Sequence, residues 1–206
     1  MPIGLVFNKE NVRTKYTCCW QEALRASVKL NALALVKSDF VLEDYVLSLP
    51  LHLRKVFSKL RTSTHILEIE LGRYKKVVLP DSVKPVKMPR ELRLCNLCNA
   101  NEVECESHFI MDCTYYGRER QLFLEQLSAL FPALTSFDTA SKLKFILSCG
   151  NGDLNISKLI CEFINEIYAL RNAFLSVSEP EPSTSQDGPV TTRAGRLSLP
   201  PLRYPN

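Results

Sequence analysis

Residues 95–113 read CNLCNANEVECESHFIMDC, and the spacing within this stretch decides the fold around it. The pattern is C-x2-C-x9-H-x4-C, in which Cys95, Cys98, His108 and Cys113 supply three sulfurs and one imidazole. Zinc takes these ligands in closed, four-coordinate structural sites, and two of them usually come from a tight C-x2-C turn. The spacing predicts a structural zinc knuckle over residues 93–116, with no open position for a catalytic water. The alternative is four unrelated buried thiol and imidazole groups.

The composition limits the class of protein. With 206 residues, 46% of them hydrophobic, the chain can bury a core in one compact domain or two small ones. Eight cysteines would suit a disulfide-stapled secreted protein, but Met1 to Gln21 lacks the apolar core of a signal peptide. We expect reduced thiols, no membrane partner and an intracellular protein, nuclear or cytoplasmic. The cysteines outside the knuckle that we expect to be small core residues are Cys18, Cys19, Cys149 and Cys161.

The rest of the chain predicts a mainly α fold, a helical domain with the knuckle embedded in it. Ala- and Leu-rich or amphipathic stretches predict helices over 22–36, 51–60, 118–131 and 155–174. The apolar stripe of the last helix is expected to be core, although it could instead be a partner-binding face. Residues 1–92 form a helical region ending in a basic connector over 74–88, and residues 117–175 form a second helical region. Residues 143–149 are a short apolar run before a turn at 150–152, and the Pro/Ser/Thr-rich residues 176–206 predict a disordered tail.

The positive charge is concentrated before the knuckle. Residues 54–93 contain eleven Lys and Arg against four acids, whereas residues 94–113 contain four acids and no Lys or Arg. Clustered cations can neutralise backbone phosphates, and an aromatic ring between them can stack on a base. The ordinary alternative is a solvated surface. The candidate nucleic-acid-binding residues are Arg54, Lys55, Lys59, Arg61, Arg73, Tyr74, Lys75, Lys76, Lys87, Arg90 and Arg93, joined by Tyr115, Tyr116, Arg118 and Arg120 beyond the knuckle. The acids at 102–112 would repel phosphate from the knuckle itself.

The Gly72-Arg73-Tyr74 signature, the knuckle and the aromatic and basic residues after it resemble the carboxy-terminal region of non-LTR retrotransposon reverse transcriptases of the jockey and CR1-like sort. The resemblance covers about residues 50–130. Cys105 stands where that family usually has an acid, so it could compete as a metal ligand. The resemblance implies nucleic-acid binding in support of target-primed reverse transcription. It does not imply polymerisation, because the Tyr-x-Asp-Asp turn that holds the catalytic magnesium is missing. By position, the knuckle ligands of that family correspond to Cys95, Cys98, His108 and Cys113. Its upstream signature corresponds to His65, Arg73 and Tyr74.

Three functions can be weighed on these residues. The first is a zinc-dependent module that binds RNA or DNA without catalysis. The second is a helical protein-interaction module that zinc only stabilises, with its partner on a helix face or on the tail, where Leu199-Pro200-Pro201-Leu202 could adopt polyproline II. The third is an enzyme, which we do not expect, because residues 114–176 offer scattered carboxylates rather than a metal-binding cluster. No small-molecule substrate is expected. His65, a lone imidazole in a largely apolar stretch, is expected to be a satisfied core or surface histidine rather than a ligand.

Overall fold

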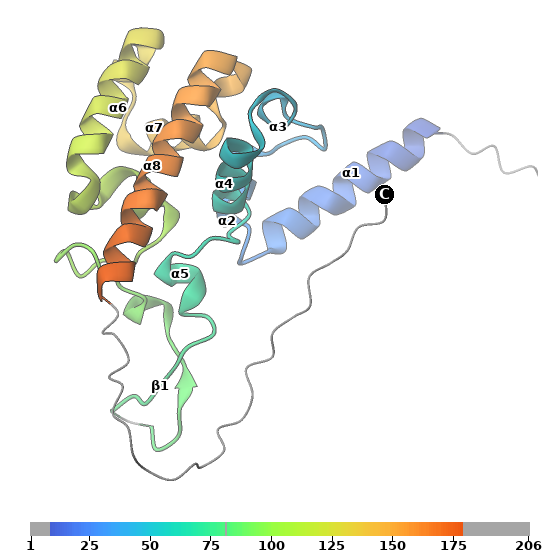
Figure 1. Ribbon diagram of the computed structural model, residues 1–206. Helices are drawn as coiled ribbons and strands as arrows, with labels where there is room; N and C mark the ends of the chain where they lie inside the picture. Colours follow the sequence, from blue (N-terminus) through green and yellow to red (C-terminus); the bar gives the residue numbers. More distant parts are fainter. Residues whose placement is uncertain (1–8, 81, 179–206) are drawn as a thin grey trace, which may run out of the picture.

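The computed structural model describes residues 9–80 and 82–178, and the described chain is mainly α-helical, as the sequence predicts (Figure 1). A two-stranded hairpin and several short turns complete it. The elements are α1 (Lys9–Ala26), α2 (Asn31–Val36), α3 (Asp44–Ser48), α4 (Leu51–Arg61), α5 (Glu68–Leu71), β1 (Lys76–Val77), β2 (Val86–Lys87), η1 (Arg90–Leu92), η2 (His108–Asp112), η3 (Thr114–Tyr116), α6 (Gly117–Leu130), η4 (Pro132–Ser136), α7 (Thr139–Leu147), η5 (Gly150–Gly152) and α8 (Leu154–Ser178). Of the described helices, none combines the length and apolarity needed to cross a membrane.

Helix α8 is the centre of the core, with α6 along one side and α4 along the other (Figure 1). Its predicted apolar stripe is core, because Ile156, Ile160, Ile164 and Ile167 are all buried. Aromatic packing joins α8 to α6, where the rings of Phe123 and Phe163 stack with centroids 4.1 Å apart. Such stacked rings add to the free energy of burying their surface.

The turn before α8 forms as the sequence predicts, and it depends on a glycine. Gly150 has φ +66°, and a Cβ there would lie 2.2 Å from Cγ2 of Ile156. Glycine is therefore needed both for the left-handed backbone and for the close approach of the helix. Asp153 then caps α8, since its Oδ1 accepts a hydrogen bond from the Ile156 N–H at 3.0 Å.

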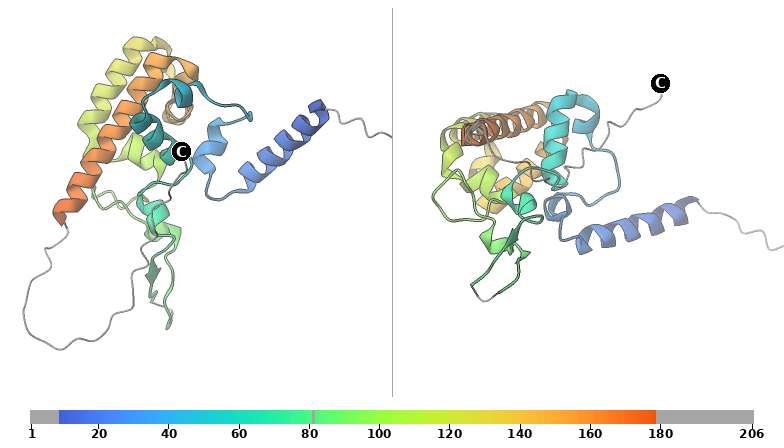
Figure 2. Two further views of the ribbon diagram at one scale, coloured as in Figure 1. Left: turned by 45° about the vertical axis from the view of Figure 1, so that its right-hand side comes forward. Right: turned by 60° about the horizontal axis from the view of Figure 1, so that its bottom comes forward.

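The amino-terminal helix differs from the prediction. The stretch 22–36 forms the end of α1 and all of α2, with a break at residues 27–30, where the Ser27 hydroxyl accepts a hydrogen bond from the Leu30 N–H at 3.3 Å. A serine that bonds to the local backbone competes with the helix in this way. Helix α1 extends away from the body in every view (Figure 2). Cys18 and Cys19 on α1 are exposed, so the prediction that they are core residues is wrong, whereas Cys149 and Cys161 are buried as predicted.

The connector predicted over 74–88 contains the hairpin, which projects from the body beyond α5 (Figures 1 and 2). The two strands are antiparallel, with Lys76 opposite Lys87 and Val77 opposite Val86. At the other end of the chain, residues 176–178 belong to α8, which corrects the predicted start of the tail. The remainder of that tail, residues 179–206, lies outside the described residues.

The knuckle shares one core with the helices on both sides of it. Its three cysteine ligands belong to the same buried cluster as Phe57 of α4 and Ile164 of α8. Glu104, 1% exposed, accepts two hydrogen bonds from the Arg171 guanidinium of α8, both at 2.8 Å. The same carboxylate accepts a hydrogen bond from the backbone N–H of Glu68, at the start of α5, at 2.7 Å. One carboxylate thus joins the knuckle to α5 and α8.

Replacing Arg171 with methionine should lower the free energy of unfolding by about 3–5 kcal/mol, because the buried Glu104 charge loses its partner. The control is Lys158→Met, which breaks an exposed α8 pair with Glu162, 3.9 Å long, and should cost less than about 1 kcal/mol. Chemical unfolding of both variants measures the difference. Equal small losses would contradict the role given to the Glu104–Arg171 pair.

Candidate metal centre and basic hairpin

The first two ligands lie on a short turn closed by backbone hydrogen bonds. The Cys95 N–H donates to the Glu102 carbonyl at 2.9 Å, and the Glu104 N–H donates to the Arg93 carbonyl at 3.0 Å. Residues 94 and 103 form an antiparallel bridge between these bonds. The return of the chain uses Asn101 at φ +54°, a left-handed conformation that asparagine tolerates better than most residues. The C-x2-C turn therefore holds Cys95 and Cys98 in a fixed relation.

The other two ligands come from a widened helical turn. In an α-helix, residues five apart in sequence do not lie on the same face. Here residues 108–112 form a π-helical turn, in which the Cys113 N–H donates to the His108 carbonyl at 2.7 Å. The extra residue in this turn brings Cys113 back beside His108. Single π turns of this kind are frequent at functional sites.

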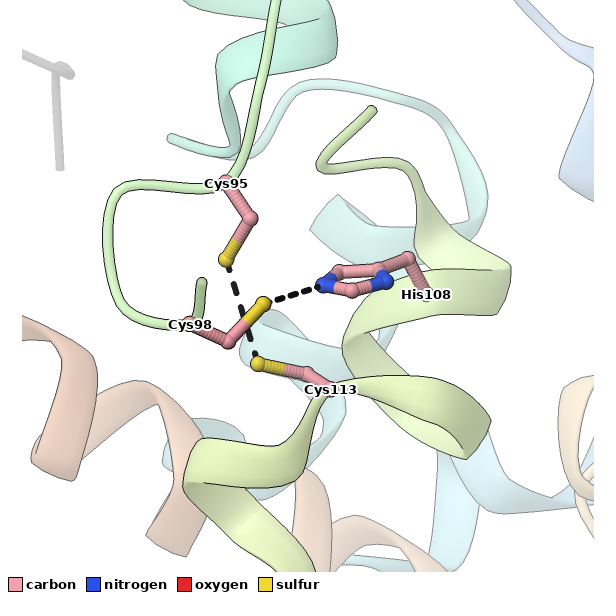
Figure 3. A group of neighbouring side chains, drawn as sticks. All are labelled: Cys95, Cys98, His108 and Cys113. Carbon is pink, nitrogen blue, oxygen red and sulfur yellow. Dashed lines mark hydrogen bonds between the residues drawn. The ribbon is translucent and has the colours of Figure 1, made fainter. Parts of the chain in front are cut away.

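The four ligand atoms form a compact, buried cluster (Figure 3). All lie within 4.8 Å of one another, with 3.8 Å between the sulfurs of Cys95 and Cys113 and 3.3 Å between Cys98 Sγ and His108 Nε2. A tetrahedron with metal–sulfur bonds of about 2.3 Å has sulfur–sulfur edges of about 3.8 Å. The cluster therefore has the donor set and the dimensions to hold a metal ion. Cys105 is outside this group and half-buried, so the structure does not support it as a competing ligand.

Two residues that the sequence analysis did not assign to the centre hold its ligands in place. Glu102 Oε2 lies 2.8 Å from His108 Nδ1, which leaves Nε2 turned toward the cysteines. A carboxylate behind a ligating histidine fixes the tautomer of the imidazole in this way. The sequence signal for this role was the presence of an acid, Glu102, in the spacer between Cys98 and His108. Arg120 donates hydrogen bonds to the carbonyls of Ile110 and Cys113, so it braces the π turn.

Protons are shared among these ligands when no metal is bound. Hydrogen bonds from Cys113 and then from His108 lower the pKa of the Cys95 thiol to about 3, against the effect of burial. The hydrogen bond to Cys95, assisted by Glu102, raises the pKa of His108 to about 9. The Cys95 thiolate raises the pKa of the Cys113 thiol above its ordinary value. These shifts favour a thiolate at Cys95 and a protonated imidazole at His108 in the metal-free centre.

Several predicted nucleic-acid contacts are used inside the protein. Arg61 is 1% exposed and donates to both carboxylate oxygens of Glu43, at 2.7 and 2.9 Å, so its prediction as a phosphate contact is wrong. Tyr116 is fully buried against Phe109 and cannot stack on a base, which corrects a second prediction. The half-buried Arg120 braces the π turn. Buried cations and rings cannot be told from surface ones when a sequence is read by residue type alone.

Three of the four acids predicted to repel phosphate from the knuckle pair with a basic residue within the described part of the protein. Glu102 pairs with His108, and Glu104 with Arg171. Glu106 lies 3.0 Å from Nε2 of His65 and accepts a hydrogen bond from the Ser63 hydroxyl at 2.8 Å. The pKa of Glu106 is lowered despite burial, because the bond to His65 favours the carboxylate. His65 is thus a buried, hydrogen-bonded histidine, the first of the two non-ligand roles expected for it.

A second group of predicted residues does meet on the surface, at the hairpin. An open hollow of about 480 Å³ is lined by Arg73, Tyr74, Lys76, Lys87 and Arg93. No carboxylate is among the described residues that line it. Exposed Lys75 lies beside them but pairs with Glu68 at 2.6 Å. Elsewhere the predicted residues are spread over other elements: Arg54, Lys55 and Lys59 on α4, Arg90 on η1, Tyr115 on η3 against Phe174, and Arg118 on α6.

Cys98→Ser and His108→Ala should each abolish the binding of one metal ion per chain and destabilise the fold. Structural metal sites of this kind contribute on the order of 10 kcal/mol of binding free energy, much of it folding free energy. Elemental analysis and thermal melting measure the two effects. Cys105→Ser, a change of the same kind at a neighbouring half-buried thiol, is the control and should keep the metal. Full metal content in Cys98→Ser would overturn the ligand assignment.

Metal binding at pH 7 should release protons from His108 and Cys113, because the raised pKa of each group favours its protonated form before a metal enters. The apparent affinity should therefore rise with pH, by about tenfold per pH unit for each proton released. Calorimetric titration in buffers of different ionisation enthalpy counts the protons. Release of none would show that the metal-free centre is already fully deprotonated.

The family models, the curated proteins and the solved structures contain no match to this chain. Its function therefore has to be inferred from the arrangement of its own residues. Two features stand out among those described: the buried Cys/His cluster and the cationic hollow on the hairpin.

Proposed function

We propose that the chain is a zinc-dependent nucleic-acid-binding module that positions RNA or DNA and does not itself catalyse a reaction. Thiolate-rich tetrahedral sets favour zinc over the harder cations that prefer oxygen ligands. All four ligands come from the protein and are buried, so they leave no place for a substrate. Bound zinc would cross-link the C-x2-C turn to the π turn, which is a structural role.

The observation that carries the nucleic-acid proposal is the pairing of Lys76 directly opposite Lys87 in the hairpin. Like charges facing each other across two strands destabilise the pair. Neither ammonium group forms an ion pair with another residue that the structure describes. Arg73 and Arg93 lie in the same hollow, and Arg73 is already paired with Glu70, so an anion placed there would meet three cations without an acidic partner among the described residues and relieve their repulsion. A phosphate backbone supplies such anions in series.

Tyr74 adds an aromatic surface to this hollow. Its side chain is 81% exposed, although a ring of this size is usually at least half-buried. A base can stack on such a ring whatever its sequence, with cations beside it to meet the phosphates. Arg73 keeps its guanidinium at the site through a 2.8 Å hydrogen bond to Glu70. The combination favours a nucleic acid over a simple inorganic anion.

The base of the hairpin is tied to the metal centre through Arg93. This side chain, two residues before Cys95, donates to the Ile69 carbonyl at 2.9 Å and through Nη2 to the Met88 carbonyl at 2.9 Å. A Cβ on Gly72 would lie 2.5 Å from Arg93 Cγ, so glycine makes room for the arginine. This gives a physical reason for glycine in the Gly72-Arg73-Tyr74 signature. We propose accordingly that the module derives from the carboxy-terminal region of a non-LTR retrotransposon reverse transcriptase.

A second candidate function is protein interaction, favoured by a run of exposed apolar side chains around α3. Phe40, Val41, Leu42, Leu47 and Leu51 are each more than half exposed. Surfaces of this kind can mark protein–protein contacts. Helix α1, extending from the body next to Phe40, would add to such a surface. This role does not require the cationic hollow, so the two functions can be separated by mutation.

The double variant Lys76→Glu/Lys87→Glu should weaken nucleic-acid binding and reduce its dependence on salt. Each lost phosphate contact lowers the slope of log K against log[salt] by about 0.7 for a single strand, so two contacts account for about 1.4. Fluorescence anisotropy across a salt series measures it. The control Lys55→Glu/Lys59→Glu makes the same charge change on α4. Equal losses in both would assign binding to overall charge rather than to the hairpin.

A further inference from the structure

A second hollow, of about 370 Å³, lies next to the hairpin site. It is formed by α2, α5, α7 and residues 105–107 of the knuckle, and it shares Arg73 and Arg93 with the hairpin hollow. The two hollows are therefore neighbours that share these two arginine side chains. The second is the more apolar, because its wall includes Ala32, Leu35 and Leu147.

The size and the lining of this pocket suit one flat, polar-edged ring. Pockets of about 300 Å³ and above accept small ligands, and they combine apolar walls with a few polar groups. Here the lining adds Ser63, Ser107, Glu70 and Glu106 to the apolar residues. Carboxylates can accept hydrogen bonds from the amino groups of a base, as they do for cytosine. The wall itself would meet the ring face.

The charge at the pocket suits a ring that carries a phosphate. Arg73, Arg90 and Arg93 line it, and Arg90 is exposed. Glu70 already pairs with Arg73, and Glu106 is bonded to His65 and Ser63, so of these three arginines Arg90 and Arg93 are without an acidic partner among the described residues. A phosphate group near the shared Arg73 and Arg93 could belong to the same strand as the phosphates in the hairpin hollow.

We propose that the chain binds single-stranded nucleic acid, with its backbone in the hairpin hollow and one unpaired base inserted in the pocket beside α2. This inference rests on the proposed function and adds to it that the bound nucleic acid is single-stranded. A base in a duplex must be unstacked and unpaired before it can enter such a pocket, at a cost of a few kcal/mol. An unpaired strand has no such cost, so the pocket favours single strands over duplex.

The test uses the full zinc-loaded chain and fluorescein-labelled single-stranded RNA, single-stranded DNA and duplex DNA of one mixed sequence. Leu35→Glu places a carboxylate on the pocket wall at a residue that is 51% exposed. Leu122→Glu on α6, at 50% exposure and outside the pocket, makes the same change and is the matched control. We expect Leu35→Glu to weaken single-strand binding about tenfold relative to Leu122→Glu, the scale of one lost base contact. Duplex binding should be equal in the two variants.

A second measurement leaves the protein unchanged. Single strands in which the bases are replaced by abasic sites keep their phosphates, and they should bind the wild-type chain about tenfold more weakly than the intact strands. Equal effects of the two Leu→Glu changes or a preference for duplex would overturn the pocket while leaving the hairpin proposal in place. Equal binding of abasic and intact strands would overturn both the pocket and the stacking on Tyr74, and would leave only the phosphate contacts of the hairpin. Absence of salt-sensitive binding to every probe would overturn the pocket and the hairpin proposal together.

Discussion

The arrangement of the molecule depends on the buried carboxylate of Glu104. It is held by both the Arg171 guanidinium and the Glu68 N–H, so the knuckle, α5 and α8 have one fixed relation. Burying two charges costs several kcal/mol for each ion unless hydrogen bonds compensate, and here two parallel bonds do so. The hairpin leaves the body just after α5 and returns just before the first ligand. The position of the hairpin therefore depends on the same Glu104–Arg171 pair.

The local features of the fold could be predicted from the sequence, because their causes are local. The ligand set is contained in one short segment, and the spacing of Cys95, Cys98, His108 and Cys113 is enough to identify it. The stripe on α8 repeats at helical spacing, and the turn at 150–152 follows from its glycines. The break at Ser27 was missed, because one hydrogen bond to the backbone outweighs the helix propensity of its Ala- and Leu-rich neighbours.

The long-range pairs could not be predicted. Glu104 and Arg171 are 67 positions apart in sequence, and residue type alone does not show which cation will meet a buried acid. The same limit explains Arg61, which looked like one of a series of surface cations but is bonded to Glu43 in the core. It also explains the acids of the knuckle. They were counted as negative surface charge, whereas Glu102, Glu104 and Glu106 each have a specific partner. For a candidate binding site, the count of charges mattered less than which of them are already paired.

The long sequence separation of Glu104 and Arg171 affects the order in which the parts of the chain fold. The four ligands lie within nineteen residues, so closing that loop costs little entropy, whereas docking α8 on Glu104 must close a loop of 67 positions. Contacts between residues close in sequence form faster than distant ones, and a chain emerging from the ribosome presents its earlier segments first. The segment that contains the four ligands can thus form while α8 is still being synthesised. A metal ion bound there would already hold the Glu104 carboxylate in position when Arg171 arrives.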